Sequence, residues 1–170
     1  MTGEVEWAGK YIRIVRDGTW EFVERCGGVH AVVILAEHDG RVVLIEQVRV
    51  PLGRRKCLEL PAGLVGDEDP DATVEGTAVK ELEEETGFTA ERIEVIGQFY
   101  SSPGMVAEGF TLVRAHGLTR IGDGGGNEHE EIEVHLVPRA DIPAFVERKR
   151  AEGVAIDVKL LLLLASSILG

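Results

Sequence analysis

The chain has 170 residues, of which 44% are hydrophobic, so it holds enough apolar material for the core of one ordinary domain. Its formal net charge of −12 argues against general nucleic-acid binding, which needs a basic surface. A phosphate-bearing substrate remains compatible with this charge, because bound divalent cations reverse the local sign.

The two ends of the chain and its two cysteines indicate a cytoplasmic protein. Residues 1–7 lack the basic region and apolar run of a secretory signal. The apolar run 160–169 has about half the length that a bilayer-spanning helix needs, so we expect a buried C-terminal helix and no membrane contact. A dimer contact is the alternative use of this run. Cys26 and Cys57 lie far apart without C-x-x-C spacing, which favours ordinary reduced thiols.

Turn signals and apolar runs divide the chain into short strands. Arg16-Asp17-Gly18 and His38-Asp39-Gly40 are hairpin signals, and each joins two such runs. The predicted strands, in chain order, lie at residues 10–15, 19–25, 29–36, 41–48, 57–60, 93–100, 110–116 and 132–137.

A central helix is predicted at residues 74–86, with Thr73 as its N-cap and Gly87 as the residue that ends it. Two more helices are expected at residues 142–151 and 157–169, and Asp157 is the N-cap of the second. Strands on both sides of one central helix indicate the α/β class, with a mixed sheet between helices.

Three carboxylates gather on one face of the predicted central helix. Glu81, Glu84 and Glu85 stand at i, i+3 and i+4, within an arc of about 100°, while Glu83 points to the opposite side. Like charges this close repel one another unless they face water or hold a cation. An acidic run by itself is usually a solvated face, but hard oxygen ligands on a rigid helix also suit Mg²⁺.

The neighbouring residues favour the cation site. The stretch Leu60-Pro61-Ala62-Gly63-Leu64 precedes the helix, and Lys80 comes directly before Glu81. Together these residues resemble the Nudix box, whose pattern is G-x5-E-x7-R-E-U-x-E-E-x-G-U with U apolar. Its last positions are filled here by Glu81, Leu82, Glu84, Glu85, Gly87 and Phe88. The resemblance implies the Nudix α/β/α sandwich at residues 28–170, with an antiparallel strand hairpin at residues 1–27 as an N-terminal extension for dimerisation and adenine binding.

The chain departs from this pattern at two places. Lys80 occupies the usual arginine slot, and lysine lacks the planar fork that orients two carboxylates at once. Strict counting from the helix puts Gly66 in the glycine slot and Ala72 in the early glutamate slot. Anchoring on Gly63 instead puts Asp69 in the glutamate slot and adds three residues before the helix. We prefer the second alignment, because it keeps an acid and the Ala62-Gly63-Leu64 context.

Nudix proteins typically hydrolyse a nucleoside diphosphate linked to another group, and the resemblance implies roles for several residues. The metal ligands would be Glu81, Glu84, Glu85 and the carbonyl of Ala62, with Glu84 also counted among the catalytic groups. The acidic segment after the glycine-rich piece 122–127 would supply the base that activates water. Glu128 and Glu130 are both candidates for that base, and Glu130 is also a candidate metal ligand. A solvated acidic loop is the alternative for this segment.

Further residues resemble the ADP-ribose pyrophosphatase branch of the family. These are the stretches 44–51 and 58–63, and Ser102-Pro103-Gly104, where Pro103 lies sixteen residues after Gly87. In that branch an aromatic pair near the N-terminus often stacks on adenine, and an arginine contacts the diphosphate. The implied substrate-binding residues are Tyr11, Trp20, Arg49, Arg54, Pro103 and Gly104. Packing within the hairpin is the alternative for Tyr11 and Trp20, and a surface ion pair is the alternative for Arg49.

The resulting hypothesis is Mg²⁺-dependent hydrolysis of ADP-ribose to AMP and ribose 5-phosphate, with Mn²⁺ as an alternative ion. The expected partners are a small nucleoside diphosphate sugar and a second copy of the chain, with the N-terminal strands crossing between the two copies. Two other functions remain open. One is hydrolysis of another nucleoside diphosphate sugar such as GDP-mannose. The other is binding of ADP-ribose without cleavage, which is suggested by Lys80 in the usual arginine slot.

Overall fold

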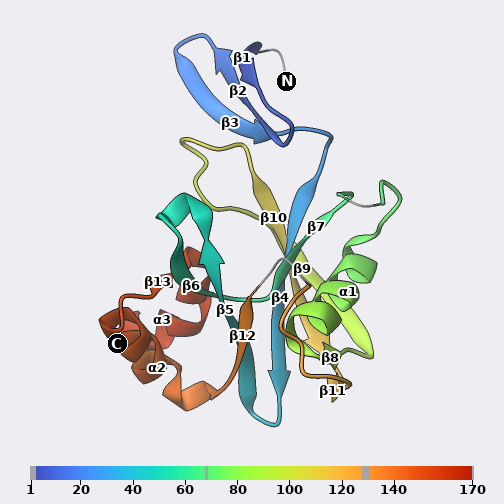
Figure 1. Ribbon diagram of the computed structural model, residues 1–170, viewed down its shortest axis with the longest axis vertical. Helices are drawn as coiled ribbons and strands as arrows, with labels where there is room; N and C mark the ends of the chain where they lie inside the picture. The colour runs from blue at the N-terminus through green and yellow to red at the C-terminus, as the bar shows by residue number, and fades with distance from the viewer. Residues whose placement is uncertain (1–2, 68, 128–130, 170) are drawn as a thin grey trace.

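The computed structural model describes residues 3–67, 69–127 and 131–169. The N-terminal residues form an antiparallel sheet of three strands, β1 (Glu4–Ala8), β2 (Ile12–Asp17) and β3 (Trp20–Arg25). The predicted hairpin corresponds to β2 and β3, and its turn holds Gly18 at a φ of 60°. β1 pairs with β2 and is not predicted by the sequence pattern. The extension is therefore a small sheet of its own, set at one end of the molecule (Figure 1).

The main sheet has eight strands. They are β4 (His30–His38), β5 (Arg41–Arg49), β6 (Arg55–Glu59), β7 (Ala62–Val65), β9 (Arg92–Tyr100), β10 (Gly109–His116), β12 (Ile132–Pro138) and β13 (Ala155–Ile156). β4 runs parallel to β10 and β6 runs parallel to β13, while the other pairs are antiparallel, so the sheet is mixed. All the predicted strands are present, with their ends shifted by no more than two residues.

β4 and β5 form a hairpin whose strands separate soon after the turn. Asp39 and Gly40 have φ values of 49° and 71°, as the two-residue turn of a twisted hairpin requires. The two strands pair only next to this turn. Farther along, β4 pairs with β7 and β5 pairs with β12, so the sheet divides into two diverging halves (Figure 1).

Helices cover both faces of the main sheet. α1 (Val74–Thr86) covers one face, and α2 (Ile142–Ala151) and α3 (Leu161–Leu169) cover the other. Successive β4 residues alternate between the two cores, because Val32 and Ile34 pack with Leu82 of α1, whereas Val33 packs with Ile142 of α2. The predicted α/β/α sandwich is therefore confirmed.

The shorter elements complete the chain. Two short strands, β8 (Phe88–Thr89) and β11 (Thr119–Arg120), pair just beyond the end of α1. Single turns of 3₁₀ helix lie at η1 (Val50–Leu52), η2 (Arg139–Asp141) and η3 (Val158–Leu160).

The ends of α1 agree with the predicted boundaries. Thr73 has an extended backbone, and its hydroxyl accepts a hydrogen bond from the Gly76 N–H at 3.0 Å. Gly87 follows the helix at a φ of 72°, and its N–H donates to the Glu83 carbonyl. This is the left-handed termination that glycine permits without strain.

Two expectations need correction. The glycine stretch before α1 is not all loop, because Ala62–Val65 forms strand β7. This strand pairs with the part of β4 that does not pair with β5. The C-terminal helix is only half buried and begins later than predicted. Asp157 accepts a hydrogen bond from the Lys159 N–H and caps η3, and α3 follows. Leu160 and Leu164 face the core, but Leu161 and Leu162 are about 50% exposed, because consecutive helical residues cannot all face one layer.

Both cysteines are free thiols, as expected. Burial, with Glu59 as a smaller contributor, raises the pKa of the Cys57 thiol to about 12, so this thiol is unreactive near neutral pH. No helix in the described part of the chain is long and apolar enough to cross a membrane.

Candidate active site

A pocket of about 500 Å³ lies where the end of β5, β7 and the exposed side of α1 come together. Its wall combines acidic groups, backbone glycines and two basic side chains. The described residues that line it are Gln47, Arg49, Ala62, Gly63, Leu64, Gly66, Asp67, Asp69, Ala72, Thr73, Gly76, Thr77, Lys80, Glu81, Glu84, Glu85 and Asn127.

The helix turns its three predicted carboxylates into this pocket. Glu81 is half-buried, Glu84 is exposed, and Glu85 is only 4% exposed. Glu83 is not among the described residues that line the pocket, which agrees with its place on the other side of the helix. The predicted acidic face is therefore part of a concave site and not an open solvated surface.

Glu85 joins the helix to the neighbouring strand. Its Oε2 accepts a hydrogen bond from the Ala62 N–H at 3.0 Å. Arg49 also interacts electrostatically with Glu85. The backbone donor and the nearby guanidinium both attract a carboxylate, so Glu85 is held against β7.

Gly63 lies directly against Glu81. A Cβ atom at residue 63 would lie 2.2 Å from the Glu81 Cγ and 2.2 Å from its Oε1. The backbone φ of Gly63 is outside the left-handed region, so it is this close approach that requires glycine. Gly66, by contrast, has a φ of 86° and open space where its Cβ would lie.

The glycine contact favours the alignment that places Gly63 in the glycine slot. In that alignment Asp69 takes the early acidic slot, and the Asp69 Oδ1 accepts a hydrogen bond from the Asp71 N–H at 3.0 Å. This local turn shapes the loop before α1. Both Asp69 and Ala72, the residue of the alternative alignment, line the pocket.

Arg49 reaches the pocket as one half of an ion pair. Its Nε and Nη2 donate to the two carboxylate oxygens of Glu59 at 2.7 and 2.5 Å. This hydrogen-bonded contact raises the pKa of the Arg49 guanidinium. Glu59 is only 3% exposed, so the pair fixes the fork of Arg49 from the inside of the protein.

The other two basic candidates differ from Arg49. Arg54 is exposed, has a φ of 61° in the turn before β6, and is not among the described residues that line the pocket. Lys80 does line the pocket, and its Nζ lies 3.9 Å from the Glu84 Oε1, one helical turn away. Lys80, in the arginine slot, therefore presents a single ammonium group to a pocket carboxylate, where arginine would present a planar guanidinium with several donors.

The donor set of the pocket fits a hard divalent cation. Three carboxylates of one helix line it, and Glu81 lies in a backbone hollow that only glycine leaves open. The oxygens of these three carboxylates do not all lie within 4.8 Å of one another. Among the described residues, only Glu46, Glu133 and His135 form a group of three ligands that close together. Two of the carboxylates have neighbours of their own, because Glu85 accepts from the Ala62 N–H and Glu84 lies beside Lys80.

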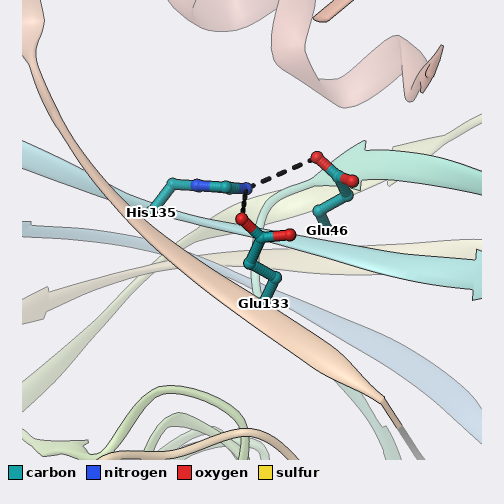
Figure 2. A group of neighbouring side chains, drawn as sticks. All are labelled: Glu46, Glu133 and His135. Atoms are coloured by element: carbon teal, nitrogen blue, oxygen red, sulfur yellow. Dashed lines mark ion pairs between the residues drawn. The ribbon is translucent and has the colours of Figure 1, made fainter. Parts of the chain in front are cut away.

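The second group of ligands lies on the opposite face of β5 and is an ion-pair network. Figure 2 shows His135 and Glu133 of β12 directed toward Glu46 of β5. The Nζ of Lys149 lies 2.7 Å from one Glu46 oxygen, and the Nζ of Lys56 lies 3.1 Å from the other. Burial raises the pKa of Glu46, but the two lysines outweigh burial and bring it below its ordinary value.

His135, whose Nε2 lies 3.4 Å from the Glu46 Oε2, completes this network. Burial and the charge of Lys149 lower its pKa. Two ammonium groups already neutralise the carboxylates here, so a metal cation would meet like charge. The network therefore holds β5, β12, β6 and α2 together, and the pocket glutamates remain the better metal ligands.

Three predicted substrate residues meet in a separate pocket. Trp20, Pro103 and Gly104 line a hollow of about 470 Å³ with Asp17, Phe22, Val106 and Ala107. Trp20 is 63% exposed and offers an open ring face there. Tyr11, which is 61% exposed, lines neither pocket as far as the chain is described.

The loop between β9 and β10 holds the N-terminal sheet against the main body. The Val23 N–H donates to the Met105 carbonyl at 3.0 Å, and the Ala107 N–H donates to the Val23 carbonyl at 2.8 Å. Arg25 and Glu108 form an ion pair at 2.5 Å. The sheet sits beside this loop and away from α1 (Figure 1).

Some site residues have no sequence signal of their own. Gln47 is a buried polar residue near the end of β5, and Asn127 follows the glycines of residues 122–126, yet both line the pocket. Glu59 belongs to the branch motif, but its role beside Arg49 depends on side-chain geometry. The two base candidates, Glu128 and Glu130, lie outside the described residues; Asn127 is their nearest described neighbour on the N-terminal side.

Comparison with known proteins decides the family. The family model of the NUDIX domain matches residues 27–158, which is most of the chain. The chain belongs to the Nudix family. The predicted family is thus confirmed, and the predicted enzyme class, a Nudix pyrophosphohydrolase, agrees with it. Nudix hydrolases generally use divalent metal ions, in accordance with the acidic pocket.

Several curated proteins are similar to this chain over much of their length. An ADP-ribose pyrophosphatase of Bacillus subtilis is 38% identical over 122 residues, which cover 70% of this chain and 63% of that protein, slightly under two thirds. A methanol dehydrogenase activator of Bacillus methanolicus is 38% identical over 132 residues, covering 76% and 68%. A GDP-mannose pyrophosphatase of Cronobacter sakazakii is 36% identical over 153 residues, covering 85% and 74%.

A solved structure supports the fold. The crystal structure of an ADP compounds hydrolase superimposes with a TM-score of 0.69 at 20% identity, covering 99% of this chain and 92% of that one. The likeness extends over the N-terminal sheet as well as the Nudix body.

The contact between Gly63 and Glu81 predicts opposite effects for two glycine substitutions. Gly63→Ala pushes the Glu81 side chain out of its hollow, so Mg²⁺ affinity should fall by about 10–100-fold with little loss of stability. Gly66→Ala should cost about 1–2 kcal/mol of stability through its left-handed backbone and leave metal affinity unchanged. Calorimetric titration with Mg²⁺ measures the first effect, and urea unfolding measures the second. Weaker Mg²⁺ binding in Gly66→Ala, with unchanged binding in Gly63→Ala, would instead place Gly66 in the glycine slot of the Nudix pattern.

Proposed function

We propose that this protein hydrolyses the diphosphate of ADP-ribose with Mg²⁺, giving AMP and ribose 5-phosphate. The observation that supports it most is the meeting of Glu81, Glu84, Glu85 and Arg49 in one pocket. The similarity to an ADP-ribose pyrophosphatase and the grouping of Trp20, Pro103 and Gly104 favour this substrate. The similarity to a GDP-mannose pyrophosphatase makes another nucleoside diphosphate sugar the second candidate.

The proposal gives each pocket residue a task. Glu81, Glu84, Glu85 and the carbonyl of Ala62 would hold Mg²⁺, which would supply charge neutralisation for the diphosphate and a more acidic bound water. Glu85 is anchored for this task by the Ala62 N–H. Arg49 is held by Glu59 through two of its nitrogens and turns the rest of its fork toward the pocket, where it contacts the diphosphate.

Release of AMP tests the proposal. The wild-type protein should release AMP from ADP-ribose in the presence of Mg²⁺, and chelation should abolish release. Glu85→Gln removes one ligand charge at a buried position, so the rate should fall by more than about 100-fold. Glu83→Gln makes the same change on the opposite side of the same helix, outside the described lining of the pocket, and should keep the rate within about twofold.

The same assay separates the competing functions. Faster cleavage of GDP-mannose than of ADP-ribose would assign the second substrate. Tight binding of ADP-ribose without any product, under the same metal conditions, would indicate a sensor and overturn the proposal.

We also propose that Glu128 or Glu130 is the base that takes the proton of the attacking water. Both follow Asn127, which lines the metal pocket, by no more than three residues in the sequence. General-base catalysis is worth about 10²–10⁴-fold. The variant that removes the base, Glu128→Gln or Glu130→Gln, should lose a factor of this size in kcat while the Kd for ADP-ribose stays unchanged. Full turnover in both variants would reject the assignment.

The nucleobase needs a surface that the metal pocket lacks. None of the described residues that line the metal pocket is aromatic, whereas base stacking on an aromatic ring is worth about 1–3 kcal/mol. Trp20 offers such a ring, but it lies in the separate pocket of the N-terminal sheet. We propose a homodimer in which the N-terminal residues 1–27 cross to the partner and bring Trp20 to the partner's metal pocket.

Two observations support this crossing. The N-terminal sheet exposes apolar side chains that a partner could cover, among them Val5, Trp7 and Ile12, each more than 40% exposed. It joins the Nudix body through Gly27 and Gly28, whose φ values are 78° and 75°. Consecutive glycines allow the connection to take another direction with little strain, once the contacts of Val23 and Arg25 with the β9–β10 loop of the same chain are released.

Substitution of Trp20 tests both the stacking and the crossing. Trp20→Ala should raise the KM for ADP-ribose by about 5- to 150-fold, and Trp20→Phe should largely keep it, because the ring remains. Co-expressed Trp20→Ala and Glu85→Gln chains should regain a low KM, since one site of the mixed dimer then holds both intact residues. An unchanged KM in Trp20→Ala would reject stacking, and mixed dimers without recovery would reject the crossing.

A further inference from the structure

The glycine-rich residues 122–126, here called the glycine segment, lie against the C-terminal end of α1. The Gly125 N–H donates to the Glu85 carbonyl at 2.9 Å, and the Gly126 N–H donates to the Glu84 carbonyl at 3.0 Å. The last carbonyls of a helix have no partner inside the helix. The segment therefore satisfies the backbone of two of the three pocket glutamates.

The contact continues beyond the helix. The N–H groups of Ile121 and Gly122 both donate to the Gly87 carbonyl, at 2.8 and 3.1 Å. The Ile132 N–H, at the start of β12, donates to the Gly125 carbonyl at 3.2 Å. The segment thus ties the end of α1 to the first residue of a core strand, and the next residue after it, Asn127, lines the metal pocket.

The two backbones touch so closely that side chains are excluded. A Cβ atom on Gly124 would lie 2.4 Å from the Thr86 carbonyl carbon and 2.7 Å from the Glu85 carbonyl oxygen. A Cβ atom on Gly87 would lie 2.3 Å from the Gly122 carbonyl oxygen. These neighbours are backbone atoms, which cannot rotate away as a flexible side chain can, so any side chain at residue 124 must separate the segment from the helix.

The direction of a helical side chain is set by the backbone that carries it. Glu84 and Glu85 lie in the last turn of α1, where a helix frays most easily when its carbonyls are unpaired. A segment that pairs these carbonyls therefore also fixes where the two carboxylates point.

We propose that Gly124 is a positioning residue for metal binding: by letting the glycine segment dock on α1, it holds Glu84 and Glu85 in the geometry that takes a divalent cation. The proposal rests on the proposed function for the assignment of these glutamates as metal ligands. It concerns Mg²⁺ binding itself and is independent of the sugar nucleotide that is cleaved.

Gly124→Ala tests the proposal, with Gly40→Ala as the matched control. The two residues have φ values of 70° and 71°, so both substitutions bring the same backbone strain. The Cβ atom at residue 40 would meet nothing within 4 Å and lies in the β4–β5 turn. Titration with Mg²⁺ alone, on protein shown to be folded by circular dichroism, should give a Kd about 10–100-fold weaker for Gly124→Ala and unchanged for Gly40→Ala.

The outcomes separate positioning from a merely structural role. Loss of stability in both variants with unchanged Mg²⁺ affinity in Gly124→Ala would overturn the proposal, as would equal weakening in the two variants. Gly124→Asn gives a further check, because asparagine tolerates the left-handed backbone but has the same Cβ. Recovery of Mg²⁺ affinity in Gly124→Asn would mean that backbone strain, not the contact with α1, is responsible.

A measurement on the wild-type chain needs no substitution. If the segment and the metal site are coupled, reciprocity requires Mg²⁺ to slow amide hydrogen exchange at Gly125 and Gly126. Unchanged exchange at both amides with saturating Mg²⁺ would overturn the proposal. Neither experiment uses ADP-ribose, so a protein that binds Mg²⁺ as described but releases no AMP would contradict the proposed substrate and leave Gly124 as a positioning residue.

Discussion

The constraint on which this site depends is the repulsion among three carboxylates on one face of a thirteen-residue helix. A helix with such a face is stable in the open because water screens the charges. Here the face is partly enclosed, with Glu85 almost fully buried, so the surrounding backbone must hold each carboxylate. β7 does this at one end, through the Ala62 N–H on Glu85 and the hollow of Gly63 around Glu81.

The division of the main sheet makes that arrangement possible. If β4 and β5 paired along their whole length, β7 would have no edge of β4 to join, and its glycine would not reach α1. The positive φ values at Asp39 and Gly40 start the hairpin with a strong twist, and the strands then part. β7 and β12 take the two free edges, so a strand carrying Ala62 and Gly63 lies beneath the acidic helix.

The sequence predicts those parts of the structure that follow from local chemistry. The cap at Thr73, the left-handed Gly87 and the spacing of the glutamates give the limits and the acidic face of α1 without any tertiary information. β7 is missed because four residues beside a proline have no periodicity to read, and their pairing depends on the departure of β5 from β4. The exposed side of α3 is missed because a run of leucines does not reveal how much of the helix the core can cover.

The candidate site shows the same limit. The sequence names Arg49 but not Glu59 as its partner, since their pairing depends on two long side chains meeting across a strand pair. Trp20 and Pro103 are named as one set with Arg49, yet the structure places them in another pocket of the same chain. Distances between pockets are a tertiary property, and residue types alone do not contain them.

The balance of charge in the metal pocket constrains how a diphosphate can enter it. Of the described residues that line it, Arg49 and Lys80 are basic, whereas Asp67, Asp69, Glu81, Glu84 and Glu85 are acidic. Arg49 is already paired with Glu59, and Lys80 lies beside Glu84, so little positive potential remains for an anion. A diphosphate without its counterion would be repelled by this pocket. In the proposed reaction a divalent cation would therefore be needed for the diphosphate to bind as well as for the water to react, and the geometry that holds the glutamates would control both steps.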